Sequence, residues 1–330
     1  MPVTKVDLSS LEFGETYHIG AAMILAPKSN MCQKYHLSYK SDSDYPMTNA
    51  QLNFLNSVLY SPSYPRDGNG VNNNGLAKNE CTEDIIAPAF ANSPTAAGNI
   101  VRKCFLIECL NNYQGEAADD AAKEMSKKLT NFIKTQDDNL KTQSKRAIIR
   151  IRNKVGQNRN ITKELVGQIA TSLKTNANIQ EIIFVGDSMD LPPEPSGVSF
   201  IDLRGFLNDT KFKEISGQGE SEQEDFSFVA QLMFFFVLFR KYEVKMQVGM
   251  MSGAMDGTAF IGVPTIFFEE QSGAAPAANS RMGQAATAIP NMEQVSYVSG
   301  SFDSSDSKKS SMPAATITAL DTAIVNLNKL

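Results

Sequence analysis

Histidine and cysteine are scarce in this 330-residue chain, and their spacing argues against several common kinds of site. The two histidines, His18 and His36, are not helically spaced partners, and no pair of the four cysteines has CxxC spacing. We therefore expect no zinc site, and we expect free thiols in a reducing compartment. The sequence also contains no serine-centred nucleophile elbow, Walker phosphate loop or GxGxxG fingerprint. Hydrolase, kinase-type and simple dehydrogenase functions are left without support.

A surplus of positive charge and a long hydrophobic run are absent too. The chain has 31 lysines and arginines against 36 acidic residues, so we expect neither a nucleic acid nor an anionic membrane as a general partner. The most apolar run, 226–239, is shorter than the ~20 residues that span a bilayer, and Gln231 interrupts it. The N-terminus lacks the apolar core of a secretory signal. These features predict a cytoplasmic protein with no membrane span.

What the chain does contain is enough apolar sequence for one large domain or two ordinary ones, with 42% hydrophobic and 20% charged residues. From Arg146 onward, strand and helix patterns alternate. Strands are predicted at 146–152, 181–186, 198–201, 244–249 and 264–268, and helices at 162–173, 225–242, 254–261 and 317–327. This alternation predicts an α/β fold with a parallel sheet and helices on both faces. We place a domain boundary between residues 145 and 146.

The first 145 residues give a weaker pattern. The run 17–25 predicts a strand, or a strand that enters a glycine turn, and 61–75 is dense in turn-forming residues. An amphipathic helix is predicted from Asp119 or Asp120 to Ile133. Near the other end of the chain, the polar segment 300–311 predicts a surface loop.

The segment 247–267 carries the clearest sign of a ligand site. A buried strand ends at Gly249, the tight turn Ser252-Gly253 follows, and a helix of small residues begins. A helix N-terminus offers unpaired N–H groups and a partial positive charge of ~+0.5, which suit a phosphate. Ligands of open parallel sheets bind at the carboxyl ends of the strands, where this turn lies.

Arginines form a second candidate site at the end of the strand 146–152. Convergent guanidinium groups suit a diphosphate because their paired donors match its geometry. Arg152 and Arg159 are preferred to Arg150, whose side chain could point outward, and a solvated edge strand is the alternative interpretation. Asp187 and Ser188, directly after the strand 181–186, could receive a base or a ribose, or could act as an ordinary turn cap.

The segment 247–267, Gln-Val-Gly-Met-Met-Ser-Gly-Ala-Met-Asp-Gly-Thr-Ala-Phe-Ile-Gly-Val-Pro-Thr-Ile-Phe, resembles the donor-binding signature of GT-B-type glycosyltransferases, those similar to heptosyltransferases and, more loosely, to fucosyltransferases. The resemblance implies two Rossmann-like domains, with a nucleotide-sugar bound mainly to the C-terminal one and no essential metal. Asp256 stands where heptosyltransferases commonly have histidine. A carboxylate there would repel a diphosphate but could bond a ribose or sugar hydroxyl.

The resemblance extends to catalysis. An arginine at the strand end, here Arg152, would bind the donor phosphate and aid its departure, as in fucosyltransferases. His18 and Gly20 lie where GT-B enzymes have a glycine-rich turn near the reacting carbon, and His18 would be the general base. A packed histidine is the alternative. The residues expected at the site are His18, Gly20, Arg152, Arg159, Asp187, Ser188, Ser252, Gly253, Asp256 and Thr258.

The sequence therefore predicts a glycosyltransferase with two Rossmann-like domains, residues 1–145 on the acceptor side and 146–330 on the donor side. It would use a nucleotide-sugar as co-substrate, with no other cofactor and no metal, and it leaves the acceptor and the oligomeric state open. Two alternatives come from other classes. One is a non-catalytic nucleotide-binding or interaction protein that has kept the fold, and the other is a different sugar-nucleotide enzyme such as an epimerase.

Overall fold

The structure is a computed structural model that describes residues 3–7, 16–18, 20–21, 34–38, 54–55, 101, 105, 118–137, 140, 143–153, 160–216, 228–271, 281–298 and 311–330. Arg159, the predicted loop at 61–75 and all but the last residue of the loop predicted at 300–311 lie outside these residues.

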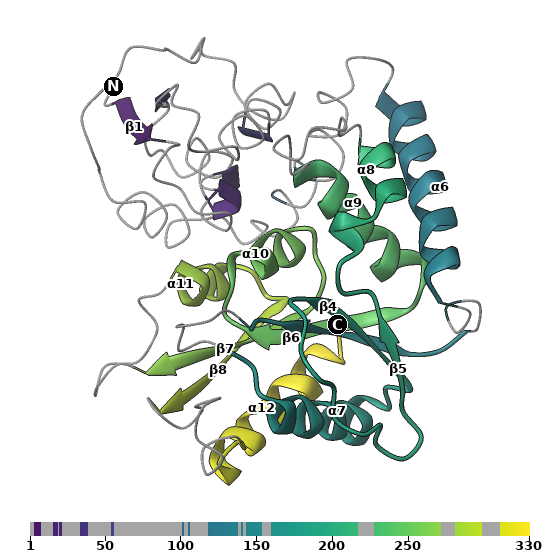
Figure 1. Cartoon of the computed structure of the whole chain (residues 1–330). Coiled ribbons are helices and arrows are strands. Elements are labelled where there is room, and N and C mark those ends of the chain that lie inside the picture. The colour runs from purple at the N-terminus through teal and green to yellow at the C-terminus, as the bar shows by residue number, and fades with distance from the viewer. Residues whose placement is uncertain are drawn as a thin grey trace.

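A six-stranded parallel sheet organises the C-terminal part of the chain (Figure 1). Its strands are β3 (Arg146–Ile151), β4 (Glu181–Gly186), β5 (Ser199–Asp202), β6 (Val244–Met250), β7 (Thr265–Gln271) and β8 (Met292–Val298). They lie in the order β5-β4-β3-β6-β7-β8. The chain thus winds outward from β3 to one edge, returns to β6 beside β3, and winds to the other edge. This is the strand order of the doubly wound nucleotide-binding fold.

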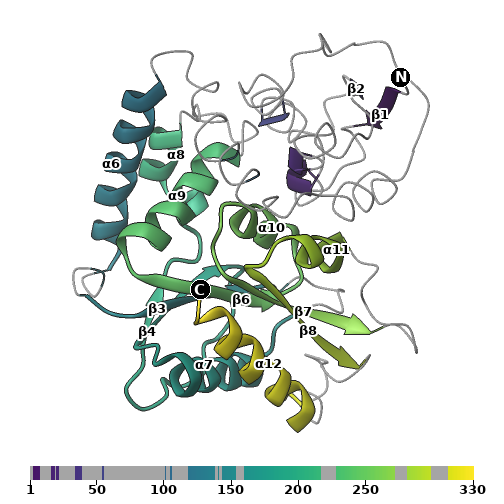
Figure 2. The same ribbon diagram turned by 180° about the vertical axis from the view of Figure 1, so that it is seen from behind.

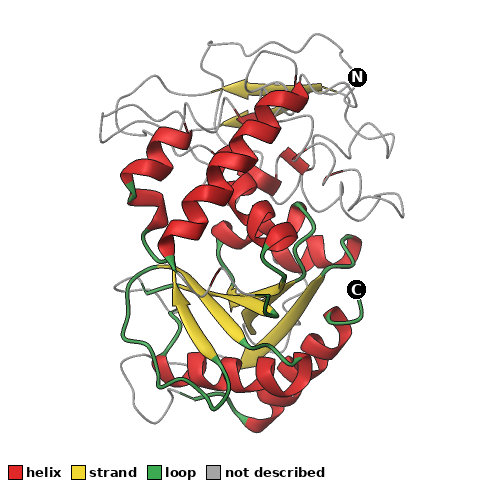
Figure 3. Ribbon diagram, turned by 90° about the vertical axis from the view of Figure 1, so that its right-hand side faces the viewer, coloured by secondary structure: helices red, strands yellow, loops and turns green. Residues whose placement is uncertain are grey.

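Helices cover both faces of this sheet, as predicted (Figure 2). One face carries α7 (Lys163–Ala177) and α12 (Ala314–Leu327). The other carries α9 (Phe228–Lys241), α10 (Gly253–Phe260) and α11 (Arg281–Ala288), with α6 (Ala118–Gln136), α8 (Thr210–Ser216) and the 3-10 turn Phe206–Asn208 packed outside α9. Figure 3 shows the sheet between these two layers. Because both faces are covered, β3, β4 and β6 are buried along almost their whole length.

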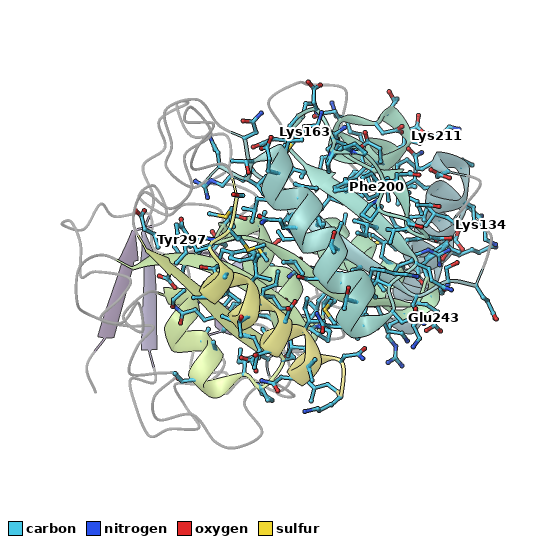
Figure 4. The ribbon with its side chains drawn as sticks, turned by 90° about the horizontal axis from the view of Figure 1, so that it is seen from below. Lys134, Lys163, Phe200, Lys211, Glu243 and Tyr297 are labelled. Carbon is cyan, nitrogen blue, oxygen red and sulfur yellow. The ribbon has the colours of Figure 1, made fainter. Side chains whose placement is uncertain are left out.

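Charged side chains are kept to the periphery, apart from a few that are paired inside. Lys134, Lys163 and Lys211 lie at the outer surfaces of α6, α7 and α8 (Figure 4). Arg146, by contrast, is 1% exposed, and its Nε donates to Glu181 at 2.6 Å. Among the described residues, no helix combines the length and hydropathy needed to cross a bilayer.

Most predicted elements of the sheet and its helices are confirmed within a few residues. Thr162 caps α7 as expected, because its Oγ1 accepts the N–H of Leu165 at 3.0 Å. The prediction for 17–25 was wrong where this segment is described, since 16–18 and 20–21 are helical. A short apolar run suits a buried helix as well as a strand. The sequence analysis also missed α8, α11 and β8. β8 was not predicted because an edge strand carries polar residues at its partly buried positions, here Glu293, Gln294 and Ser296.

The described residues of the N-terminal part include a two-stranded parallel sheet, formed by β1 (Val3–Asp7) and β2 (Lys34–Ser38). They also include an aromatic cluster that packs against α10. The ring of Tyr17 lies edge-on to Phe54 at 5.3 Å between centroids, and Phe105 meets Phe260 of α10 at 5.8 Å. Tyr17 needs a glycine opposite it, since a Cβ on Gly257 would lie 2.6 Å from its Cζ. Segment 16–21 therefore docks closely on α10.

Replacing Gly257 with alanine should destabilise the protein by about 1–3 kcal/mol, because the added methyl group overlaps the Tyr17 ring. Gly167→Ala in α7 is the matched control. Its new Cβ would lie 3.6 Å from Pro192 Cβ, so the helical alanine should be neutral or stabilise by up to about 1 kcal/mol. Denaturant unfolding measures both. Equal stability of the two variants would mean that Tyr17 does not dock on α10.

Candidate functional site

The direction of winding reverses between β3 and β6, and in folds of this kind such a switch point leaves a crevice outside the carboxyl ends of the two strands. In open α/β sheets, ligands bind at this switch point, outside the carboxyl ends of the strands. The two segments that the sequence analysis singled out end here, and they are in contact. Arg152, which follows β3, donates from Nη1 to the carbonyl oxygen of Met251, which follows β6, at 3.1 Å.

The N-terminus of α10 lies at the same end of the sheet, just after β6. Ser252 occupies the N-cap position in extended conformation, but its side chain makes no capping hydrogen bond. Within the described part of the chain, the N–H groups of Gly253 and Ala254 form no backbone hydrogen bond either. All three residues are half-buried. A helix end of this kind normally finds partners in a side chain, water or a ligand, so it has the donors to receive an anion.

β6 approaches β3 closely at Gly249, just before the turn Ser252-Gly253. A Cβ on Gly249 would lie 3.0 Å from both the Cβ and the carbonyl oxygen of Arg150, and 3.2 Å from Sδ of Met255. A side chain at this position would push β6 away from β3 or α10 away from the sheet. The glycine at position 249 thus allows α10 to pack closely on the sheet.

The end of β4 forms the other wall of the crevice. Gly186 has a φ of 105° and lies against the backbone of Ile151. The N–H of Asn153 donates to Oδ2 of Asp187 at 2.8 Å, and Nδ2 of Asn153 donates to the carbonyl oxygen of Ser188 at 2.9 Å. Asp187 and Ser188 therefore lie beside the end of β3, and they hold the chain that leaves Arg152.

A buried polar network lies under α10, and its central member is Arg150. This side chain is 7% exposed, which corrects the expectation that it could point outward. Its Nη2 donates to Oγ1 of Thr258 at 2.9 Å, its Nε donates to Oε1 of Gln247 at 3.3 Å, and its guanidinium lies 4.3 Å from the ring centre of Phe235. Burial lowers the pKa of Arg150 to about 10, although Tyr17 and Asp256 oppose the shift. The group stays charged at neutral pH.

Other members of the network hold the body of α10. Nε2 of Gln247 donates to the carbonyl oxygen of Met255 at 3.1 Å and to Oγ1 of Thr265 at 2.8 Å. At the C-terminal end of the helix, Nδ2 of Asn291 donates to the carbonyl oxygens of Ala259 and Val263, each at 3.0 Å. The helix is therefore fixed to β3, β6, β7 and the start of β8, while its N-terminus is left open.

His18 and Asp256 meet where segment 16–21 packs against α10. Nε2 of His18 lies 3.0 Å from Oδ2 of Asp256, and both side chains are 0% exposed. The imidazole also lies edge-on to Phe260, with 4.9 Å between ring centres. A general base and an acceptor of sugar hydroxyls, the roles expected from the sequence, must touch a ligand. In this conformation both side chains are enclosed, and they join segment 16–21 to α10.

The remaining expected residues divide between the crevice and the interior. Ser252, Gly253, Arg152, Asp187 and Ser188 lie around the crevice. Gly20 is buried, and a Cβ there would lie 3.1 Å from Cε1 of Phe54, so it serves packing. Thr258 is buried under Arg150. Among the described residues, no group of three potential metal ligands is found.

Sequence reasoning missed Gln247, Asn153 and Asn291, and it ranked Arg150 too low. Two signals were available. Gln247 is a polar residue between the apolar residues Met246 and Val248 of a strand, which indicates a buried hydrogen-bonding role. Arg150 stands two residues after Ile148, so the two point to the same face of β3. If that face carries a core, then Arg150 is inside it.

Arg150→Met should destabilise the protein because Gln247 Oε1 and Thr258 Oγ1 would each lose a buried donor. The free energy of unfolding should fall by about 1–3 kcal/mol for each group left without a partner. Part of this loss is offset because the variant no longer buries a charge. Arg240→Met on the exposed end of α9 is the control and should change stability little. Urea unfolding would contradict the network's importance if both variants had the wild-type midpoint.

Comparison with known proteins adds little beyond this geometry. No protein-family model matches the chain, and no curated protein sequence matches it. Among solved structures, the chain is similar to one described as the glycosyl transferase family 9 from Veillonella parvula DSM 2008, with 10% sequence identity and a TM-score of 0.41. The match covers 98% of this chain and 96% of that one. At this identity no residue role is carried over.

Proposed function

We propose that the crevice between β3 and β6 binds the diphosphate of a nucleotide. The observation that carries this proposal is the uncapped N-terminus of α10 at the switch point of the sheet. The N–H donors of Gly253 and Ala254 would bind phosphate oxygens, and the helix dipole would favour their charge. Arg152 contributes a permanent positive charge beside the same turn, where its hydrogen bond to Met251 holds it.

We further propose that the nucleotide carries a sugar and that the protein is a glycosyltransferase of GT-B type. The resemblance of segment 247–267 to a donor-binding signature supports this step. In the reaction, an acceptor hydroxyl forms a bond to the sugar carbon while the bond to the phosphate oxygen breaks, and the nucleoside diphosphate leaves with the electron pair. The α10 N-terminus and Arg152 would stabilise that leaving charge without a metal. Residues 1–145 would supply the binding site for the acceptor and the base that takes the proton of its hydroxyl.

One observation favours a second candidate, a protein that binds nucleotides but does not transfer sugar. His18, the histidine proposed as base, is completely buried and lies against Asp256. If segment 16–21 stays docked on α10, this imidazole meets no acceptor. The two candidates share the diphosphate site and differ in turnover.

Nucleotide binding is tested with a pair of variants at one position. Gly253→Pro removes the N–H that would bind phosphate, and proline is well tolerated at the first helical position. The extended Ser252, with φ −152° and ψ 146°, also suits a following proline. Gly253→Ala keeps the N–H and is the control.

A thermal-shift panel of UDP, GDP, ADP and CMP with their sugars should contain a nucleotide that stabilises wild type and Gly253→Ala. At 100 times Kd the gain is about 2.7 kcal/mol. Gly253→Pro should lose most of this gain while it keeps its own unliganded stability. Arg152→Ala should weaken the response, and Arg240→Ala should not. If no nucleotide stabilises wild type at millimolar concentration, the proposed function is wrong.

Turnover separates the two candidates. Wild type incubated with the nucleotide-sugar selected by the panel should release nucleoside diphosphate, slowly to water or faster to an acceptor, which chromatography detects. Arg152→Ala should reduce this rate by more than it reduces binding of the nucleotide-sugar, because the negative charge on the leaving diphosphate is larger in the transition state than in the bound nucleotide-sugar. Tight binding with no release, with mixed sugars and lipid or peptide extracts as acceptors, would support the non-catalytic candidate.

A further inference from the structure

Stretches of the N-terminal part that are far apart in the sequence pack together against α10. Their buried apolar residues, each exposed by 2% or less, are Tyr17, Ala21, Phe54, Leu55, Val101 and Phe105. They belong to one continuous hydrophobic core with Met255 and Phe260 of α10 and with Phe267 of β7. The core on this face of the sheet is therefore built by both parts of the chain.

Four aromatic rings form a chain that crosses from the N-terminal part to the helix. Tyr17 lies edge-on to Phe54, with 5.3 Å between centroids. Phe54 lies edge-on to Phe105 at 5.2 Å, and Phe105 lies edge-on to Phe260 at 5.8 Å. Edge-to-face pairs stabilise a contact beyond the area that they bury. Separation of the N-terminal part from α10 would break the last of these contacts and expose the rings to water.

The polar pair at the same place contributes less to holding the two parts together. His18 and Asp256 are completely buried. Removing polar groups from water costs free energy that their mutual attraction does little more than repay. Each ring, by contrast, gains free energy when it leaves water. The apolar contact therefore decides whether the N-terminal stretches stay on α10, and it favours the attached state.

α6 attaches the N-terminal part at a second place on the same face of the sheet. The ring of Phe132 lies 5.9 Å from that of Phe212 in α8 and 6.3 Å from that of Phe234 in α9, between centroids. Oη of Tyr242 donates to the carbonyl oxygen of Thr130 at 3.0 Å. α9 contacts both α6 and α10 and lies between them (Figures 1 and 2). A body that is held at two separate places cannot pivot freely about either one.

We propose that these two attachments lock the N-terminal part to the sheet domain, residues 146–330, so that the two unfold as one cooperative unit and have no hinge at α10. Domains of one chain normally move relative to each other unless the interface between them is large and hydrophobic. In this protein the interface is part of the core itself. A ligand at the carboxyl ends of β3 and β6 would then bind without closure of two domains. The inference concerns the unliganded protein, so it does not depend on the proposed function.

The test uses one new thiol on each side of the contact. Ala21→Cys and Ala147→Cys, made in separate proteins, place a small side chain at two positions that are 0% exposed, one in segment 16–21 and one in β3. A buried thiol reacts with a labelling reagent only when its surroundings open. Peptide mass spectrometry follows each new thiol separately from the four native cysteines.

Labelling is measured at urea concentrations below the unfolding transition. The two thiols should show the same dependence on urea and, after correction for the unfolding free energy of each variant, rates within about threefold of each other. If the Ala21→Cys thiol reacts more than about tenfold faster, with little dependence on urea, then segment 16–21 detaches alone and the inference is wrong.

Gly257→Ala, added to each cysteine variant, tests whether the contact is coupled to the sheet. The new methyl group overlaps the Tyr17 ring, so labelling should become faster by roughly tenfold at both positions. Gly167→Ala in α7 is the matched control and should accelerate neither. Acceleration at position 21 alone would show that the sheet is indifferent to the contact, and this would overturn the inference.

Calorimetry of the wild type gives a measurement without any substitution, which decides if a cysteine variant does not fold. One transition, with equal calorimetric and van't Hoff enthalpies, is expected of a single cooperative unit. Two transitions would overturn the inference. Failure of every nucleotide in the thermal-shift panel would contradict the proposed function but not this inference, because the labelling and calorimetry use the protein alone.

Discussion

The hydrogen bond between Arg150 and Thr258 ties the sheet to the helix on which the candidate site depends. A buried guanidinium is costly unless its donors and charge are compensated. In this protein it is compensated by Gln247, Thr258 and the face of Phe235, and a carboxylate lies nearby on the same helix. The strength of these contacts in a low-dielectric interior gives α10 one position over β3 and β6. Since its side chains and its C-terminal end are held, its N-terminus can remain open without the helix fraying.

This arrangement explains how an acidic residue can stand in the first turn of a helix that we propose binds an anion. The sequence alone suggested that Asp256 faces a ligand and repels a diphosphate. In the structure the carboxylate is completely buried and lies against His18. Positive charge at the proposed site would then come from Arg152 and the helix dipole. Asp256, the residue at which the chain differs from the family it resembles, thus belongs to the contact between segment 16–21 and α10.

The sequence predicted the sheet domain well, since buried parallel strands such as 181–186 and capped helices such as α7 leave local signals. The turn at Ser252-Gly253 was also predicted, because small residues between a strand and a helix are typical of a tight turn. The partners of these residues were harder to predict. Strand order decides that Arg152 meets Met251, and a single strand pattern does not contain strand order. Likewise, nothing local to His18 indicates Asp256, which is more than two hundred positions away, and a short apolar run around Tyr17 suits a helix and a strand equally.

The two glycines on opposite sides of α10 have a mechanical consequence. Gly249 lets the sheet come close to one side of the helix, and Gly257 receives the ring of Tyr17 on the other. Close contacts therefore fix α10 on two sides. A shift of segment 16–21 along α10 would move the Tyr17 ring out of the space that Gly257 leaves for it. Motion of the N-terminal segment relative to the sheet therefore has two forms, a complete detachment at Tyr17 or a rigid movement that carries α10 with it. The second form would break the hydrogen bond between Arg150 and Thr258.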